Sequence, residues 1–164
     1  MNSRVPPTAP IKNLKELQTI VEEQKGKGRR VIFANGCFDL LHVGHIRYLT
    51  QARALGDLLI VGVNDDASTR ALKGEERPLM GQEDRLEILS ALRCVDYLLL
   101  FGEQDVSRIL KVLKPHVHAK GTDYAEDTVP ERETVRAYGG EVAITGDPKT
   151  RSSSDFIRQL TSDD

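Results

Sequence analysis

The chain has 164 residues, of which 39% are hydrophobic and 29% are charged, and its formal net charge is −2. This length and balance suit one globular domain with a substantial core. The nearly neutral charge argues against nucleic acid or another polyanion as a partner.

The sequence predicts a cytoplasmic protein that does not enter a membrane. No apolar run approaches the roughly 20 residues that a membrane-spanning helix needs, and the first ten residues lack the apolar segment of a secretory signal. The two cysteines, Cys37 and Cys94, form no disulfide framework and fit a reducing compartment. Prolines near the start predict a mobile leader over 1–12, followed by a single domain over 13–164.

Beyond the leader, short apolar runs alternate with segments of helical periodicity. Asn13 is expected to cap a first helix that ends near Gly26. Strands are expected at 31–34, 58–63, 97–101, 116–120 and 141–144. Further helices are expected at 45–55, 66–72, 82–92, 105–113, 130–138 and 153–160. This alternation predicts an α/β fold with a Rossmann-like, doubly wound, five-stranded parallel sheet flanked by helices.

In such a sheet the carboxyl ends of the strands share one edge, and ligands bind there. The edge is expected to collect the turn after the first strand, the segment 64–66, the segment 120–123 and the loop before Ser152. Polar side chains in these four places are therefore the candidates for a binding site.

The segment 34–45 reads Ala-Asn-Gly-Cys-Phe-Asp-Leu-Leu-His-Val-Gly-His and lies where a strand passes into a helix. A helix N-terminus holds anions through its unpaired N–H groups, and Gly44 permits close approach of a phosphate. Two imidazoles beside these groups suit a nucleoside triphosphate. The alternatives are a zinc site, which would need further ligands that no C-x-x-C pair supplies, and an ordinary turn with incidental histidines.

This segment resembles the H-x-G-H nucleotidyltransferases, and most of all their cytidylyltransferase-like branch. Within that superfamily, segments 64–68, 72–78, 120–124 and 138–142 make the chain most similar to the heptose 1-phosphate adenylyltransferases. The resemblance implies attack of a sugar-phosphate oxygen on the α-phosphorus of ATP, with release of pyrophosphate. Because 164 residues leave no room for a sugar kinase, the stand-alone form of that enzyme is expected.

The resemblance also implies roles for particular residues. His42 and His45 are the expected transition-state stabilisers, with Lys73 as a third catalytic group in a closing loop. The expected nucleotide-binding residues are Ala34, Asn35, Gly36, Phe38, Gly44, Arg85, Lys120, Gly121, Asp123, Arg151, Ser152, Ser153 and Ser154. The expected substrate-binding residues are Asp39, Arg47, Asp65, Asp66 and Thr122.

Several of these residues have an alternative, purely structural interpretation. Phe38 lies either under the ribose or in the core, and Asp39 orients a histidine, binds the acceptor or caps the turn. Arg85 reaches a phosphate or pairs at the surface with Glu83 or Asp84. Helix capping is the alternative for Asp65, Asp66 and Ser152. His116, His118 and Cys37 are interpreted as structural.

The resemblance implies Mg²⁺ carried by the nucleotide phosphates and no metal held by the protein alone. The expected partners are ATP or CTP and a sugar phosphate, with a homodimer as one arrangement. Three other functions stay open from the sequence: a CTP-dependent cytidylyltransferase for glycerol 3-phosphate, an FAD synthetase of the archaeal type and a nucleotide-binding module without catalysis. Thr122 stands where relatives commonly have glycine, which bears on the identity of the acceptor sugar.

Overall fold

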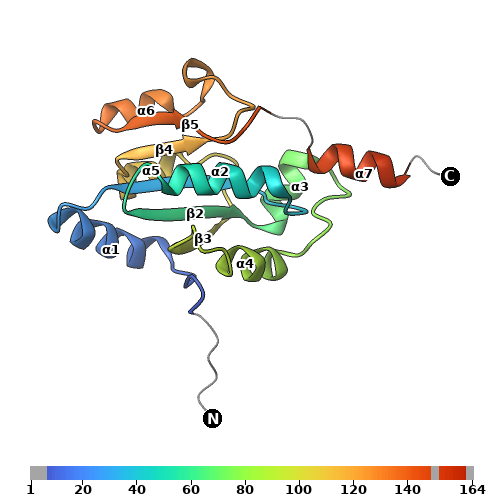
Figure 1. Cartoon of the computed structure of the whole chain (residues 1–164), viewed down its shortest axis with the longest axis horizontal. Helices are drawn as coiled ribbons and strands as arrows, with labels where there is room; N and C mark the ends of the chain where they lie inside the picture. Colours follow the sequence, from blue (N-terminus) through green and yellow to red (C-terminus); the bar gives the residue numbers. More distant parts are fainter. Residues whose placement is uncertain (1–6, 149–151, 162–164) are drawn as a thin grey trace, which may run out of the picture.

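The computed structural model describes residues 7–148 and 152–161. Within these ranges five strands form one sheet in the order β3-β2-β1-β4-β5, and every neighbouring pair is parallel (Figure 1). The strands are β1 (Val31–Gly36), β2 (Leu58–Asn64), β3 (Tyr97–Phe101), β4 (Val117–Lys120) and β5 (Glu141–Ile144). The predicted doubly wound parallel sheet is confirmed.

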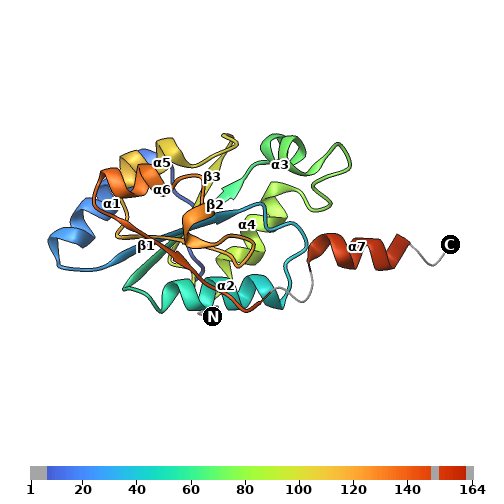
Figure 2. The same ribbon diagram turned by 90° about the horizontal axis from the view of Figure 1, so that it is seen from above.

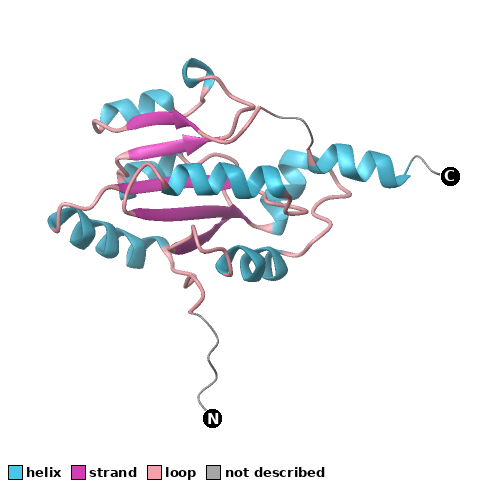
Figure 3. Cartoon of the chain, viewed as in Figure 1, coloured by secondary structure: helices cyan, strands magenta, loops and turns pink. Residues whose placement is uncertain are grey.

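Helices cover both faces of this sheet and alternate with the strands along the chain (Figures 2 and 3). They are α1 (Leu14–Gly26), α2 (Val43–Arg53), α3 (Asp66–Lys73), α4 (Gln82–Ser90), α5 (Ser107–Leu113), the 3₁₀ turn η1 (Glu126–Thr128), α6 (Arg132–Ala137) and α7 (Ser153–Thr161). One apolar core lies between the sheet and α2 with α4, and the other lies between the sheet and α1, α5 and α6. None of the described helices is long and apolar enough to cross a membrane.

The pattern of β1 and β2 explains why two cores form. Ile32 and Ala34 point into the first core, whereas Val31 and Phe33 point into the second. All seven residues of β2 are buried, as expected for a parallel strand with helices on both faces. These apolar strands lie in the middle of the domain, and their packing determines where the residues at their carboxyl ends reach the surface.

The order of the strands creates a switch point between β1 and β4. From β1 the chain winds outward to β2 and β3, and it then returns to the other side of β1 to form β4 and β5. Connections on the two sides leave in opposite directions, which opens a crevice beyond the carboxyl ends of β1 and β4. The fold therefore places Asn35 and Lys120 at the position where ligands bind in this architecture.

Several boundaries differ from the sequence-based expectation by one or two residues, and the differences at α2 and at the leader have clear structural causes. α2 begins at Val43, two residues early, because His42 itself acts as the N-cap in an extended conformation. Residues 9–12 do not belong to a mobile leader: Ala9 is buried, and Ile11 pairs with Leu98 of β3. Backbone hydrogen bonds between Pro10, Lys12 and Leu98 therefore protect the outer edge of β3.

β4 carries a histidine within the core. His118 is fully buried, and its Nε2 lies 2.9 Å from Asn35 Oδ1. Because that oxygen can only accept, the proton of the neutral ring is on Nε2, and the buried Nδ1 has no hydrogen-bond partner among the described residues. Burial, together with the charge of Lys120, lowers the pKa of His118 to about 3. The ring is thus neutral at physiological pH and serves the structure, as expected.

This burial makes folding stability depend on pH. The unfolded chain protonates His118 near pH 6.5, whereas the folded chain does so only near pH 3, so its contribution is complete above pH 6.5 and is lost as the pH falls toward 3. Between pH 7 and pH 5 the loss is about 2 kcal/mol. His118→Leu is expected to lack this component when urea unfolding is compared at the two pH values. Equal losses in the variant and the wild type would contradict the burial of a neutral ring.

Candidate active site

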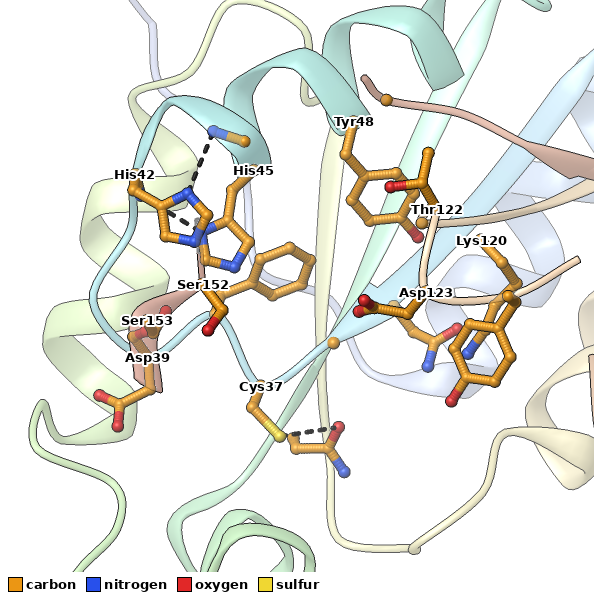
Figure 4. Close-up of a pocket in the computed structure, with 18 of the residues that line it drawn as sticks. Cys37, Asp39, His42, His45, Tyr48, Lys120, Thr122, Asp123, Ser152 and Ser153 are labelled. Carbon is orange, nitrogen blue, oxygen red and sulfur yellow. Dashed lines mark hydrogen bonds between the residues drawn. The ribbon is translucent and has the colours of Figure 1, made fainter. Parts of the chain in front are cut away.

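A cavity of about 900 Å³ opens at the switch point (Figure 4). Its walls come from the β1–α2 turn, the end of α3, the loop after β4, the loop after β5 and the start of α7. Of the predicted site residues, the lining includes Asn35, Gly36, Phe38, Asp39, His42, Gly44, His45, Arg47, Lys73, Lys120, Gly121, Thr122, Asp123, Ser152, Ser153 and Ser154. Segments more than a hundred residues apart in the sequence are thereby brought together, as predicted.

The two histidines of the β1–α2 turn are held in defined orientations by the backbone. His42 Nδ1 accepts a hydrogen bond from the Gly44 N–H at 3.1 Å, and His45 Nδ1 accepts one from the His42 N–H at 3.2 Å. Each neutral ring therefore carries its proton on Nε2. The ring centroids are 4.1 Å apart, so the helix N-terminus presents a compact pair of imidazole N–H donors.

Gly44 has a role that the sequence did not reveal. A Cβ atom at this position would lie 2.8 Å from Cε1 of the His42 ring, closer than real Cβ contacts. The missing side chain makes room for the ring to fold back over the helix N-terminus. In this structure the glycine of the H-x-G-H motif therefore positions His42, in addition to the phosphate approach expected of it.

The turn before the histidines contains local backbone strain. Phe38 and Leu40 both adopt the left-handed conformation with φ of 53°, which non-glycine residues avoid. Phe38 is buried in the core and meets the His45 ring edge-on at a centroid distance of 5.5 Å. The core alternative for Phe38 therefore holds, and the residue also lines the cavity.

Lys120 supplies a buried cation at the other side of the cavity. Its side chain ends 4.5 Å from the centroid of the Tyr124 ring, and only 8% of the residue is exposed. Burial lowers the pKa of Lys120, and the nearby carboxylates of Glu131 and Asp123 partly offset this. The following loop adds Thr122, whose hydroxyl donates to the Asp147 carbonyl at 2.9 Å.

The start of α7 contributes hydroxyl groups next to the histidines. Ser152 and Asp155 form a reciprocal cap, since the Ser152 hydroxyl oxygen accepts from the Asp155 N–H and Asp155 Oδ2 accepts from the Ser152 N–H. The Ser153 hydroxyl donates to the Asp39 carbonyl at 2.8 Å and so ties α7 to the β1–α2 turn. The capping interpretation of Ser152 is confirmed. Arg151, the predicted charged neighbour, lies outside the described residues.

Asp39 lines the cavity, and its carboxylate has a structural role. Its side chain is buried and accepts hydrogen bonds from Arg77 Nε at 2.6 Å and from the N–H groups of Leu79 and Met80. Burial by itself would raise the pKa of Asp39, but these hydrogen bonds lower it overall. The carboxylate therefore anchors the loop between α3 and α4 to the β1–α2 turn.

Four more predictions at this edge are corrected. Ala34 is fully buried in the first core and does not line the cavity. Arg85 does not reach the cavity: its guanidinium is buried and donates to the carbonyls of Met80, Cys37 and Asn64 and to the Asp66 carboxylate. Asp66 is thereby committed to Arg85. Asp65 caps α3 by accepting from the Ser68 N–H at 2.7 Å. None of these three charged residues lines the cavity, because their charges hold the strand ends and loops together.

The cavity also contains residues that the sequence analysis missed. Tyr48, one turn after His45 on α2, donates its hydroxyl to the Ala119 carbonyl, and Asp147 pairs with Arg47 at 3.0 Å. Glu131 and Phe156 line the wall as well. The helical spacing from His45 was a usable signal for Tyr48. No sequence signal pointed to Glu131, because it follows Lys120 by eleven positions in an irregular segment.

The structure shows where Cys37 lies and whether the ligands that a zinc ion would need are present. Cys37 is half-buried in the cavity wall, where its thiol lies 3.9 Å from Asn64 Oδ1. Within residues 7–148 and 152–161, no three His, Cys, Asp or Glu side chains gather as metal ligands. The two histidines use Nδ1 to accept hydrogen bonds from backbone N–H groups instead.

A doubly wound sheet with an imidazole pair, serine hydroxyls and lysines around a cavity at its switch point defines a nucleotide-handling α/β protein. The comparison with protein families agrees. The model of the cytidylyltransferase-like family matches residues 33–159, and the chain belongs to this family. The predicted membership of the nucleotidyltransferase superfamily is confirmed.

Two relatives with similar sequences are bifunctional proteins named HldE. The bifunctional protein HldE of Geobacter sulfurreducens is 49% identical over 152 residues, and that of Pelobacter propionicus is 47% identical over 150 residues. These alignments cover 93% and 92% of this chain. The chain spans 31% of the length of each of these curated relatives.

Solved structures give the same fold. The lipopolysaccharide core biosynthesis protein from Thermoplasma volcanium matches with a TM-score of 0.65 and 29% identity, over 74% of this chain and 100% of that chain. Pantoate-beta-alanine ligase from Francisella tularensis matches with a TM-score of 0.62 over 94% of this chain and 74% of its own. The second likeness, at 16% identity, concerns the fold alone.

The corrected role of Arg85 leads to a stability prediction. Arg85→Ala leaves three carbonyls and a carboxylate without their buried donor, so we expect a loss of about 3–5 kcal/mol in the free energy of unfolding. Arg93, an exposed arginine just after α4, provides the control, and Arg93→Ala is expected to change that free energy by no more than about 0.5 kcal/mol. Urea titration measures both. A stable Arg85→Ala variant that no longer binds nucleotide would contradict this structural role and would support the predicted contact of Arg85 with a phosphate.

Proposed function

We propose that this protein transfers AMP from ATP to heptose 1-phosphate and forms ADP-heptose and pyrophosphate. The observation that carries the proposal is the pair His42 and His45, fixed through Nδ1 so that both Nε2–H groups can serve the cavity. The relatives named HldE and the neighbour described as a lipopolysaccharide core biosynthesis protein support the choice of a bacterial surface sugar.

The reaction follows from the chemistry of the groups around the cavity. An oxygen of the sugar phosphate attacks the α-phosphorus of ATP, the bond from that phosphorus to the bridging oxygen breaks, and pyrophosphate leaves. Such a transfer needs positioning and charge stabilisation more than a covalent nucleophile. His42 and His45 donate hydrogen bonds to phosphate oxygens whose charge grows in the transition state.

Other groups hold the reactants. Lys73, the last residue of α3, faces the cavity from a solvent-accessible position suited to the phosphates. Ser152 and Ser153 place the N-terminus of α7 beside the histidines, where N–H and hydroxyl groups suit the β- and γ-phosphates. Arg47 lies at the cavity wall in a half-exposed pair with Asp147, so that an incoming acceptor phosphate can compete for it.

The residues present fit Mg²⁺ that arrives with the nucleotide. Such an ion keeps its bonds to phosphates and water and needs one or two carboxylates at most, and Asp123 lines the cavity as such a carboxylate. When bound, the ion neutralises phosphate charge.

The decisive experiment is magnesium-dependent release of pyrophosphate. ATP, CTP, GTP and UTP are each combined with heptose 1-phosphate and with glycerol 3-phosphate. Release with ATP and heptose 1-phosphate alone supports the proposal. Release only with CTP and glycerol 3-phosphate would assign the chain to the cytidylyl-transferring alternative, and nucleotide binding without release from any pair would indicate a binding module.

Substitution of the histidines tests their role. His42→Ala and His45→Ala are each expected to lower kcat about 10²–10³-fold, because each removes one preorganised donor to the transition state. Steady-state pyrophosphate assays give kcat and the KM for ATP. The matched control is His116→Gln: His116 accepts from the Val31 N–H at the opposite end of the sheet, and the glutamine oxygen can replace it there. Unchanged kcat in either cavity variant would remove the assignment.

A further inference from the structure

Glu131 is a buried glutamate whose carboxylate is not fully hydrogen-bonded within the described residues. Only 4% of the residue is exposed, yet Oε2 has no hydrogen-bond partner among the described residues. It occupies the N-cap position of α6 without making a side-chain cap. A buried acceptor left unpaired destabilises a protein by about 1–3 kcal/mol, so its presence needs a reason outside the packing of the domain.

The same residue belongs to the wall of the active-site cavity, together with Lys120. Lys120 is also almost buried, and it contacts the Tyr124 ring. Burial lowers the pKa of Lys120, whereas the charge of Glu131 raises it. However, no ion pair within 4.0 Å joins Lys120 to a carboxylate in the part of the chain that the structure describes. An acid and a base therefore face one cavity without neutralising each other directly.

The chemistry of this pair selects one kind of ligand group. A phosphate oxygen would be attracted by Lys120 but repelled by Glu131, and an apolar group would leave both charges unpaired. A sugar hydroxyl satisfies both, because it donates to the carboxylate and accepts from the ammonium. The exposed part of the Tyr124 ring adds an apolar face of the type on which sugars and bases pack.

The position within the cavity fits this selection. Figure 4 shows Lys120 and Asp123 on one side of the cavity and His42, His45 and Ser152 on the other. The second side offers N–H and hydroxyl donors suited to phosphates, whereas the first contains the Asp123 carboxylate beside Lys120. A bound nucleotide can thus extend from one side to the other, with its sugar near Lys120.

We propose that Glu131 and Lys120 form a subsite for the hydroxyl groups of a sugar, with the Glu131 carboxylate accepting from a hydroxyl and Lys120 donating to a neighbouring oxygen. The subsite rests on the proposed function, because that function supplies two sugars, the ribose of ATP and the acceptor heptose. Both present adjacent hydroxyls, and the experiment separates them.

The first measurement is binding of nucleotide alone by isothermal titration calorimetry. The wild type is expected to bind ATP about 10-fold or more tightly than 2′-deoxyATP or 3′-deoxyATP, as a hydrogen bond to a charged group implies. Glu131→Gln, which retains the size but loses the charge, is expected to bind all three nucleotides with similar affinity. The control is Glu133→Gln on α6, where an exposed glutamate pairs with Arg136.

The second measurement separates the acceptor from the ribose. If the subsite holds the heptose, Glu131→Gln raises the KM for heptose 1-phosphate and leaves nucleotide affinity unchanged, which supports the subsite and assigns it to the acceptor. If neither the selectivity for hydroxyls nor the acceptor KM changes, the subsite is overturned while the proposed function stands. Failure of the wild type to bind ATP would overturn both.

Thermal unfolding distinguishes a binding residue from a structural one. Because Oε2 is unpaired, Glu131→Gln is expected to unfold at the same Tm as the wild type or a higher one. A lower Tm with the wild-type selectivity retained would assign Glu131 to the stability of the fold and overturn the subsite. The conservative variant Glu131→Asp, with a shorter reach, is expected to bind nucleotide with reduced but detectable selectivity for the hydroxyls.

Discussion

The geometry of the candidate site depends on one buried charge, the Arg85 guanidinium, which does not line the cavity. The buried guanidinium of Arg85 donates to carbonyls at the end of β2, in the β1–α2 turn and in the loop before α4, and it also pairs with Asp66. A single planar group with five donors thereby joins three segments that are distant in the sequence. Asp39 and Arg77 make a second connection of the same kind. The edge of the sheet is rigid because these charges are paired within the protein.

The buried acids at this edge therefore divide into two kinds. Asp39 accepts three hydrogen bonds from the protein and has its carboxylate committed to the fold. Glu131 is equally hidden, but its Oε2 has no such bond among the described residues. The hydrogen bonds to Asp39 stabilise the folded state, whereas Glu131 Oε2 makes no such contribution in the part of the chain that is described. Buried polar atoms without a partner in the protein are candidates for contact with a ligand. Burial alone does not distinguish them, whereas the hydrogen bonds do.

This distinction explains what the sequence could predict. The five strands were predictable because runs such as Leu58–Val63 are apolar on both faces, and the histidine turn was predictable because its residues are contiguous. Arg85, Asp65 and Asp66 were expected to contact ligands but lie outside the cavity wall, because the residue types that bind ligands also anchor loops. Which role applies depends on burial and on partners far along the chain. Glu131 was missed for the same reason, since its proximity to Lys120 arises only from the tertiary fold.

The hydrogen bond from Ser153 to the Asp39 carbonyl spans 114 positions of the chain. A ribosome makes the β1–α2 turn early and α7 last of the described elements. The histidine pair is therefore made long before the serines that complete the adjacent part of the cavity wall. The cavity therefore has all of its described walls only in a chain that has been made as far as α7.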